Sequence, residues 1–193
     1  MQLTKFLPLL FLAFSFSCNT KHHFSTTVES DVQVEKSQLE LKATEGLFYY
    51  GDTSFTGTSI SSYPNQVLSE SIQFRNGKKH GAFKKWYSNG QISFEGTYND
   101  GRLDGKVTTW WKDGTIRSEA NYESGVLSGV QKQWYSSGSL FKQLTYVEGK
   151  EEGLQKAWRE NGKIYNNYEA KNGRIFGLKR ANLCYELSDE IIQ

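Results

Sequence analysis

Residues 98–121 read YNDGRLDGKVTTWWKDGTIRSEAN, and a unit of this length and pattern recurs along the chain. One tryptophan returns every 24 residues, each time in the same frame of glycines. A fixed period of this size is typical of a repeat protein, in which each unit packs on its neighbours. The repeating tryptophans are Trp86, Trp110, Trp134 and Trp158.

The repeat pattern extends over residues 45–178, which we expect to form one repeat domain. Its end units are degenerate, as capping requires, because terminal repeats must close an otherwise open sheet edge. Residues 179–193 are predicted to form a C-terminal cap. The degenerate first unit covers residues 47–73, four clear units cover 74–97, 98–121, 122–145 and 146–169, and a partial unit covers 170–178.

The pattern inside one unit predicts a β-hairpin. Residues 82–87 and 92–98 are rich in aromatic side chains, and Asn89-Gly90 lies between them. Asn-Gly favours a tight hairpin turn because both residues can take a positive φ. At the other end, Gly81 follows four residues after Gly77, so we expect a longer loop there. Two turns per unit predict an all-β fold, in which antiparallel hairpins with a 24-residue period form a single elongated, twisted meander sheet.

The face that carries the tryptophans depends on the turn. A two-residue loop pairs Tyr87 with Ile92, whereas a three-residue loop with a bulge places Trp86 beside Ile92. Both alternatives align equivalent side chains of successive repeats into ladders across the sheet. Such a ladder is either a binding platform or the contact that holds hairpins together, and we favour the structural interpretation. The ladder residues are Trp86, Trp110, Trp134, Trp158, Tyr98, Tyr122 and Tyr146.

The unit that begins at Tyr98 resembles the variant MORN repeat found in bacterial proteins described as YwqK-type antitoxins. The shared features are the leading aromatic residue, two glycines four residues apart, the pair Trp110-Trp111 and the glycine at Gly114. The resemblance covers about residues 47–178. It implies an antiparallel sheet of hairpins, with protein binding or lipid association as its usual roles.

The N-terminal residues 1–18 are typical of an export signal. Lys5 supplies a positive charge, and the apolar run at 6–16 is too short to span a bilayer as a helix. Ser17-Cys18 ends this run and resembles the lipobox of bacterial lipoproteins, which implies lipidation of Cys18. The alternatives are an ordinary cleaved signal peptide and a plain N-terminal anchor. The polar residues 19–44 are predicted to form a tether, and their last part is a candidate edge strand.

One cluster of basic residues is a candidate contact for an anionic partner. It surrounds His80 and contains no acidic residue, although later units carry glutamates in the corresponding turn. A solvated loop and strand edge is the interpretation we favour. The basic residues are Arg75, Lys78, Lys79, Lys84 and Lys85.

The composition argues against several classes of function. A net charge of +2 does not favour binding of nucleic acid, and the three histidines form no metal-ligand pattern. We therefore expect no cofactor, no metal and no enzymatic activity. The sequence favours a membrane-anchored envelope protein that binds an unidentified protein partner as a scaffold. The alternatives are an antitoxin or immunity protein of a toxin-antitoxin module and a module that binds glycans or lipid headgroups.

Overall fold

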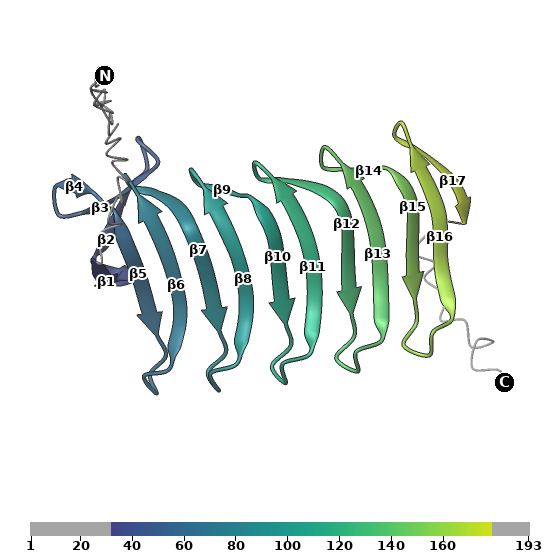
Figure 1. The fold of residues 1–193 in the computed structure, drawn as a ribbon, viewed down its shortest axis with the longest axis horizontal. Helices are drawn as coiled ribbons and strands as arrows, with labels where there is room; N and C mark the ends of the chain where they lie inside the picture. Colours follow the sequence, from purple (N-terminus) through teal and green to yellow (C-terminus); the bar gives the residue numbers. More distant parts are fainter. Residues whose placement is uncertain (1–31, 179–193) are drawn as a thin grey trace, which may run out of the picture.

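The computed structural model describes residues 32–178, so the predicted export signal, Cys18 and the C-terminal cap lie outside the described residues. The repeats build one large sheet, with strands that follow one another along its long axis (Figure 1). Its strands are β5 (Gly57–Ser62), β6 (Leu68–Arg75), β7 (Lys78–Trp86), β8 (Ile92–Asn99), β10 (Gly105–Trp110), β11 (Ile116–Glu123), β12 (Val126–Trp134), β13 (Leu140–Val147), β15 (Gly153–Trp158), β16 (Ile164–Lys171) and β17 (Arg174–Leu178).

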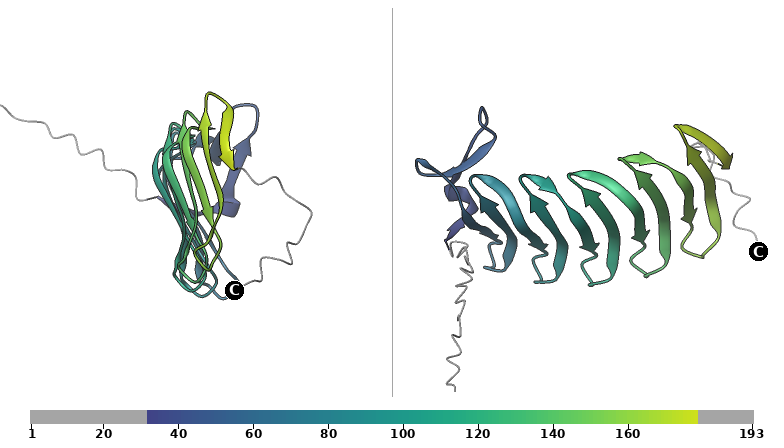
Figure 2. Two further views of the ribbon diagram at one scale, coloured as in Figure 1. Left: turned by 90° about the vertical axis from the view of Figure 1, so that its right-hand side faces the viewer. Right: turned by 45° about the horizontal axis from the view of Figure 1, so that its top comes forward.

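Every neighbouring pair from β5 to β17 is antiparallel, as the sequence predicts. Two short strands, β9 (Arg102–Leu103) and β14 (Lys150–Glu151), pair with β8 and β13 near the turns. Seen along the long axis, the hairpins superpose as one layer (Figure 2). The predicted all-β meander with a repeat period of 24 residues is therefore confirmed.

The N-terminal end of the sheet carries a cap. The strand β1 (Gln33–Glu35) pairs in parallel with β5, and a short 3-10 helix, η1 (Lys36–Gln38), follows it. A separate sheet of β2 (Leu39–Lys42), β3 (Leu47–Tyr50) and β4 (Thr53–Ser54) then lies on one side of the main layer (Figure 2). The only multi-residue hydrophobic core cluster within residues 32–178 lies here and consists of Val34, Phe55, Ile72, Phe74 and Phe83.

This cap corrects two expectations. The predicted tether at 19–44 is structured from Gln33 to Lys42, because Val34 and Leu39 bury their side chains against the first repeat. Residues 39–42 form part of the separate sheet, and the edge strand of the main sheet is β1. The first unit is also split, since its residues 47–54 belong to the cap and the rest to β5 and β6.

The two kinds of turn are the reverse of what the glycine spacing predicts. At Asn76-Gly77 the loop has two residues between the paired Arg75 and Lys78, and both have a positive φ, of 50° and 78°. This backbone is that of a type I′ hairpin turn, which matches the right-handed twist of the strands. The same pair of positive φ values recurs in each unit, at Asp100-Gly101, Ser124-Gly125, Glu148-Gly149 and Asn172-Gly173.

At Asn89-Gly90 the loop has three residues. Tyr87 donates its N–H to the carbonyl of Gln91 at 2.8 Å, Gly90 donates to Tyr87 at 2.9 Å, and in this loop only Gly90 has a positive φ. Trp86 pairs with Ile92 across this hairpin, so the structure selects the three-residue alternative.

The second glycine of each unit belongs to a bulge inside a strand. On β7 the partner of Phe74 is Lys79, and the partner of Ile72 is already Phe83. The strand therefore carries two extra residues around Gly81, whose φ is 94°. Such a bulge bends the strand, and a glycine takes this positive φ without strain. The spacing of four between glycines marks this bulge, not a longer loop.

Gly77 and Gly101 occupy the same place in successive type I′ turns, but only Gly77 lies beneath the cap. A Cβ on Gly77 would lie 2.9 Å from the carbonyl oxygen of Phe48 and 3.0 Å from Cβ of Leu47, whereas a Cβ on Gly101 meets nothing within 4 Å. Gly101→Ala should lower the free energy of unfolding by about 1 kcal/mol through φ strain alone. We expect Gly77→Ala to cost more, measured as urea unfolding midpoints, and equal midpoints would contradict the close packing of the cap.

Candidate binding surface

The four repeating tryptophans form a row with aliphatic partners. Residues directly opposite each other in an antiparallel pair share a face of the sheet. Each tryptophan therefore lies beside the first residue of the strand that follows the three-residue turn. All four are half-buried, while Ile116 and Ile164 are 38% and 52% exposed. We call these residues the tryptophan row, which comprises the pairs Trp86–Ile92, Trp110–Ile116, Trp134–Leu140 and Trp158–Ile164.

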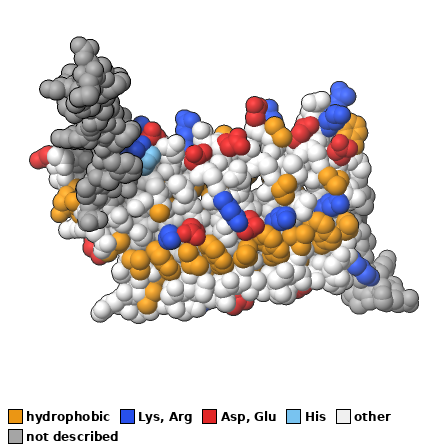
Figure 3. Space-filling view, viewed as in Figure 1, with side chains coloured by type: hydrophobic (Ala, Val, Ile, Leu, Met, Phe, Trp, Pro, Cys, Tyr) orange, Lys and Arg blue, Asp and Glu red, His pale blue; other side chains and the backbone are white. Residues whose placement is uncertain are grey.

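A hydrophobic band follows the same level of the sheet. It runs along the long axis, close to the end that carries the three-residue turns, and charged side chains of both signs lie beside it (Figure 3). The tryptophan row occupies this end of each hairpin, because Trp86 and its counterparts are the last residues of their strands. The repeats thus present an elongated apolar strip on a surface that is otherwise mixed in charge.

The aromatic residue that follows Trp86, Trp110 and Trp134 joins one repeat to the next. Tyr87 donates its hydroxyl to the carbonyl oxygen of Trp110 at 2.8 Å, 23 residues ahead. Tyr63, Trp111 and Tyr135 make the equivalent bond, from a hydroxyl or an indole N–H, to the carbonyls of Trp86, Trp134 and Trp158 at 2.9, 3.2 and 3.0 Å. We call these four contacts the cross-repeat hydrogen bonds.

These bonds were not predicted from the sequence, although their signal is present in it. A second aromatic residue directly follows the repeating tryptophan at Tyr87, Trp111 and Tyr135, and Tyr63 stands one period earlier. Each of these side chains carries a hydrogen-bond donor. The residue after Trp158 is Arg159, which is not aromatic. The cross-repeat hydrogen bonds therefore place a contact between hairpins at the second aromatic residue of the pair, whereas the sequence predicts it at the tryptophan itself.

The tyrosines at the start of each unit form a separate, half-buried column. Tyr98 packs on Phe83 with a ring-centroid distance of 5.6 Å, inside the part of the sheet that the cap covers. Burial raises the pKa of Tyr98 and of Tyr146 above the usual value of 10.0. Tyr122 lies at the equivalent position between them and is also half-buried. This column is part of the packing of the sheet.

The predicted basic cluster is divided between the two faces of the sheet. Lys79 and Lys85 lie over the rings of Phe83 and Tyr98 beside the cap. Lys84 points to the opposite face, where its Nζ lies 2.8 Å from a carboxylate oxygen of Glu95. Arg75 and His80 lie 3.5 and 3.4 Å from the carboxylate of Asp100, and Lys78 is exposed at the turn. These residues do not form one patch.

Buried polar groups near the C-terminal end serve packing. Gln155 is fully buried, and its amide exchanges hydrogen bonds with the backbone N–H and carbonyl of Thr145 at 2.8 and 2.9 Å. The buried Tyr168 donates its hydroxyl to Glu151 at 2.7 Å. Burial, followed by this hydrogen bond, raises the pKa of Tyr168 far above its usual value. Both side chains therefore fill space inside the sheet with their polar groups satisfied.

Within residues 32–178, no group of three His, Cys, Asp or Glu side chains is arranged to hold a metal ion. Across the same residues, no helix has the length and apolar character needed to cross a membrane.

Comparison with known protein families identifies the repeat. The family model of the MORN repeat variant matches residues 79–100, 103–124 and 127–148. These three segments are similar to the MORN repeat variant. Each match runs from one type I′ turn to the next, and so covers a complete hairpin with its tryptophan. MORN repeats are generally non-catalytic and often take part in binding. A search of curated proteins found no match to the chain.

Tyr87→Phe removes one cross-repeat hydrogen bond and keeps the ring. We expect the free energy of unfolding to fall by about 1 kcal/mol, because the carbonyl of Trp110 loses its side-chain donor. Urea unfolding followed by tryptophan fluorescence measures the change. The control is Tyr50→Phe, since the exposed hydroxyl of Tyr50 makes no hydrogen bond within the described residues. Equal effects of the two substitutions would show that the bond contributes nothing.

Proposed function

We propose that this chain is a non-enzymatic scaffold of the cell envelope that binds a partner protein along the tryptophan row. The observation that carries the proposal is the elongated apolar strip, which repeats in each hairpin and remains partly open to solvent. Aromatic side chains, tryptophan among them, are enriched at the centres of protein interfaces, which are also more apolar than the rim. The rigid repeats space them regularly along the sheet.

The charges beside the row support a protein partner over nucleic acid. Lys84 pairs with Glu95, and Lys106 pairs with Glu119 at 2.6 Å. In these units the positive and negative charges beside the strip are therefore paired with one another. Phosphate recognition uses unpaired positive charge, whereas paired charges beside an apolar strip suit a partner with an apolar centre and a polar rim.

The proposed envelope location rests on the N-terminal sequence. Lipidation at Cys18 would attach the chain to a membrane, and residues 19–31 would connect the lipid to the cap that begins at β1. In this arrangement the membrane contact is made by the lipid, and the tryptophan row stays available to the partner.

Site-specific crosslinking in intact cells tests the proposed binding surface. A photoreactive amino acid at position 116 or 164 should capture one defined protein, identified by mass spectrometry. Position 147 is the control, because Val147 is as exposed as Ile164, at 53% against 52%, and lies outside the row. Ile116→Glu should abolish the capture from position 164. Equal capture from all three positions, or none from the row, would overturn the proposal.

Metabolic labelling tests the proposed anchor. Radiolabelled palmitate should enter the wild-type chain and not Cys18→Ala, because the thiol is the acceptor. Cys184→Ala is the matched control and should be labelled like the wild type. Equal labelling of Cys18→Ala and the wild type would disprove lipidation at this residue.

A further inference from the structure

A cavity of about 290 Å³ lies between the cap and the first repeats. Its apolar walls come from two directions, with Leu39 and Phe48 on the cap and Ile72, Phe74 and Phe83 on β6 and β7. An adjoining hollow of similar volume shares Phe48, Lys79 and Tyr98 with it. The cap therefore leaves space over part of the face that it covers.

The polar groups that line this cavity carry an excess of positive charge. Lys36, Lys79 and Lys85 face the single acid Glu70, so three positive charges meet one negative charge. Glu70 is already occupied on both oxygens, since Lys36 lies 2.6 Å from one of them and Lys85 lies 3.5 Å from the other. The third ammonium group, that of Lys79, has no carboxylate within 4.0 Å among residues 32–178.

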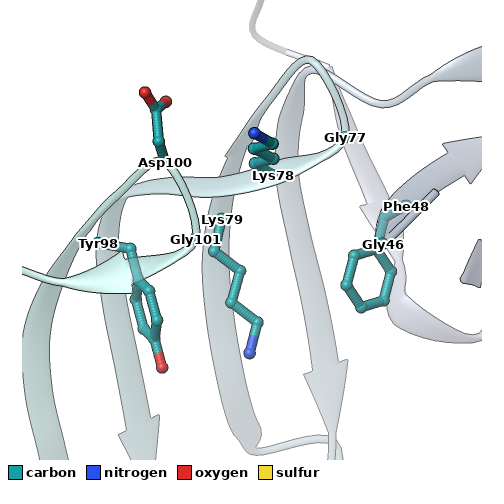
Figure 4. A pocket seen from close by; sticks show the side chains of 8 residues that line it. All are labelled: Gly46, Phe48, Gly77, Lys78, Lys79, Tyr98, Asp100 and Gly101. Atoms are coloured by element: carbon teal, nitrogen blue, oxygen red, sulfur yellow. The ribbon is translucent and has the colours of Figure 1, made fainter. Parts of the chain in front are cut away.

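The side chain of Lys79 lies between aromatic rings. Figure 4 shows it between Tyr98 and Phe48, while Lys78 and Asp100 point away from the hollow. Its Nζ is 5.2 Å from the ring centroid of Tyr98 and 5.8 Å from that of Phe83. Burial lowers the pKa of Lys79. The negative charge of Glu70 opposes this shift, and the positive charges of Lys36 and Lys85 add to it. A desolvated ammonium group in this position gains much from an anion.

We propose that this cavity binds a small amphiphilic carboxylate, with its apolar body against Phe48 and Phe83 and its carboxylate on the ammonium group of Lys79. The walls favour an aliphatic or aromatic body, because they remove it from water. The excess positive charge favours an anion over a neutral or cationic ligand of the same shape. A single carboxylate matches the one ammonium group without a carboxylate partner. The site is separate from the tryptophan row and does not depend on the role proposed for that row.

Isothermal titration calorimetry of the full chain with sodium octanoate tests the site. We expect saturable binding to the wild type and weakening by about tenfold or more in Lys79→Met, which keeps the aliphatic stem and removes the charge. Lys79→Arg should restore most of the affinity. Lys84→Met is the matched control, because Lys84 lies on the opposite face and should not affect the titration.

Two further probes separate the contributions of charge and apolar surface. 1-Octanol should bind weakly and equally to the wild type and Lys79→Met, and acetate should show no saturable binding. Absence of octanoate binding to the wild type would overturn the proposal. So would equal octanoate affinity in Lys79→Met, or an equal loss in Lys84→Met. The far-UV spectrum of Lys79→Met, compared with the wild type, confirms that the sheet is intact.

Discussion

A sheet one layer thick has no second layer against which to bury its side chains, so each hairpin depends on its neighbours for stability. The cross-repeat hydrogen bonds meet this need at one end of the strands, where the hydroxyl of Tyr87 reaches the carbonyl of Trp110. At the other end each type I′ turn contacts the strand that follows the preceding turn, as the backbone N–H of Gly101 donates to the carbonyl of Lys79 on β7 at 2.8 Å. Each hairpin is thus held at both ends. The rows of equivalent side chains, and the apolar strip they form, follow from that alignment.

The fold could be predicted from the sequence because a period of 24 residues with glycine turns allows few other arrangements. The turn types could not, since the same dipeptide Asn-Gly occurs in both turns, at Asn76-Gly77 and at Asn89-Gly90. What separates them is whether the asparagine also takes a positive φ, and the register of the flanking strands decides that. The cap was missed for a related reason. Its strands are short, and they are stabilised by contacts of Val34 and Leu39 with a distant repeat.

The candidate site, like the fold, could be predicted from the sequence only in part. The spacing of the tryptophans predicts that they form a row. Their exposure depends on the face of the sheet on which they lie, and the turn with its bulge decides that face. The sequence presents the basic cluster as one group because its members lie close together along the chain, whereas successive residues of a strand point to opposite faces. The cavity at Lys79 had no sequence signal, since its walls come from the cap and from β6 and β7, which are separated along the chain. Only the folded cap brings them together.

The cross-repeat hydrogen bonds also set how the length of this protein can vary. Each bond joins a residue to one 23 positions ahead, across a boundary between units that are alike in pattern. If residues 98–121 were lost as a block, Tyr87 would meet the carbonyl of Trp134 in place of Trp110, and the alignment would be restored. Loss of a single residue would shift both ends of a hairpin at once. The sheet of such a chain can therefore become longer or shorter by whole hairpins, with the cap and the final strand unchanged.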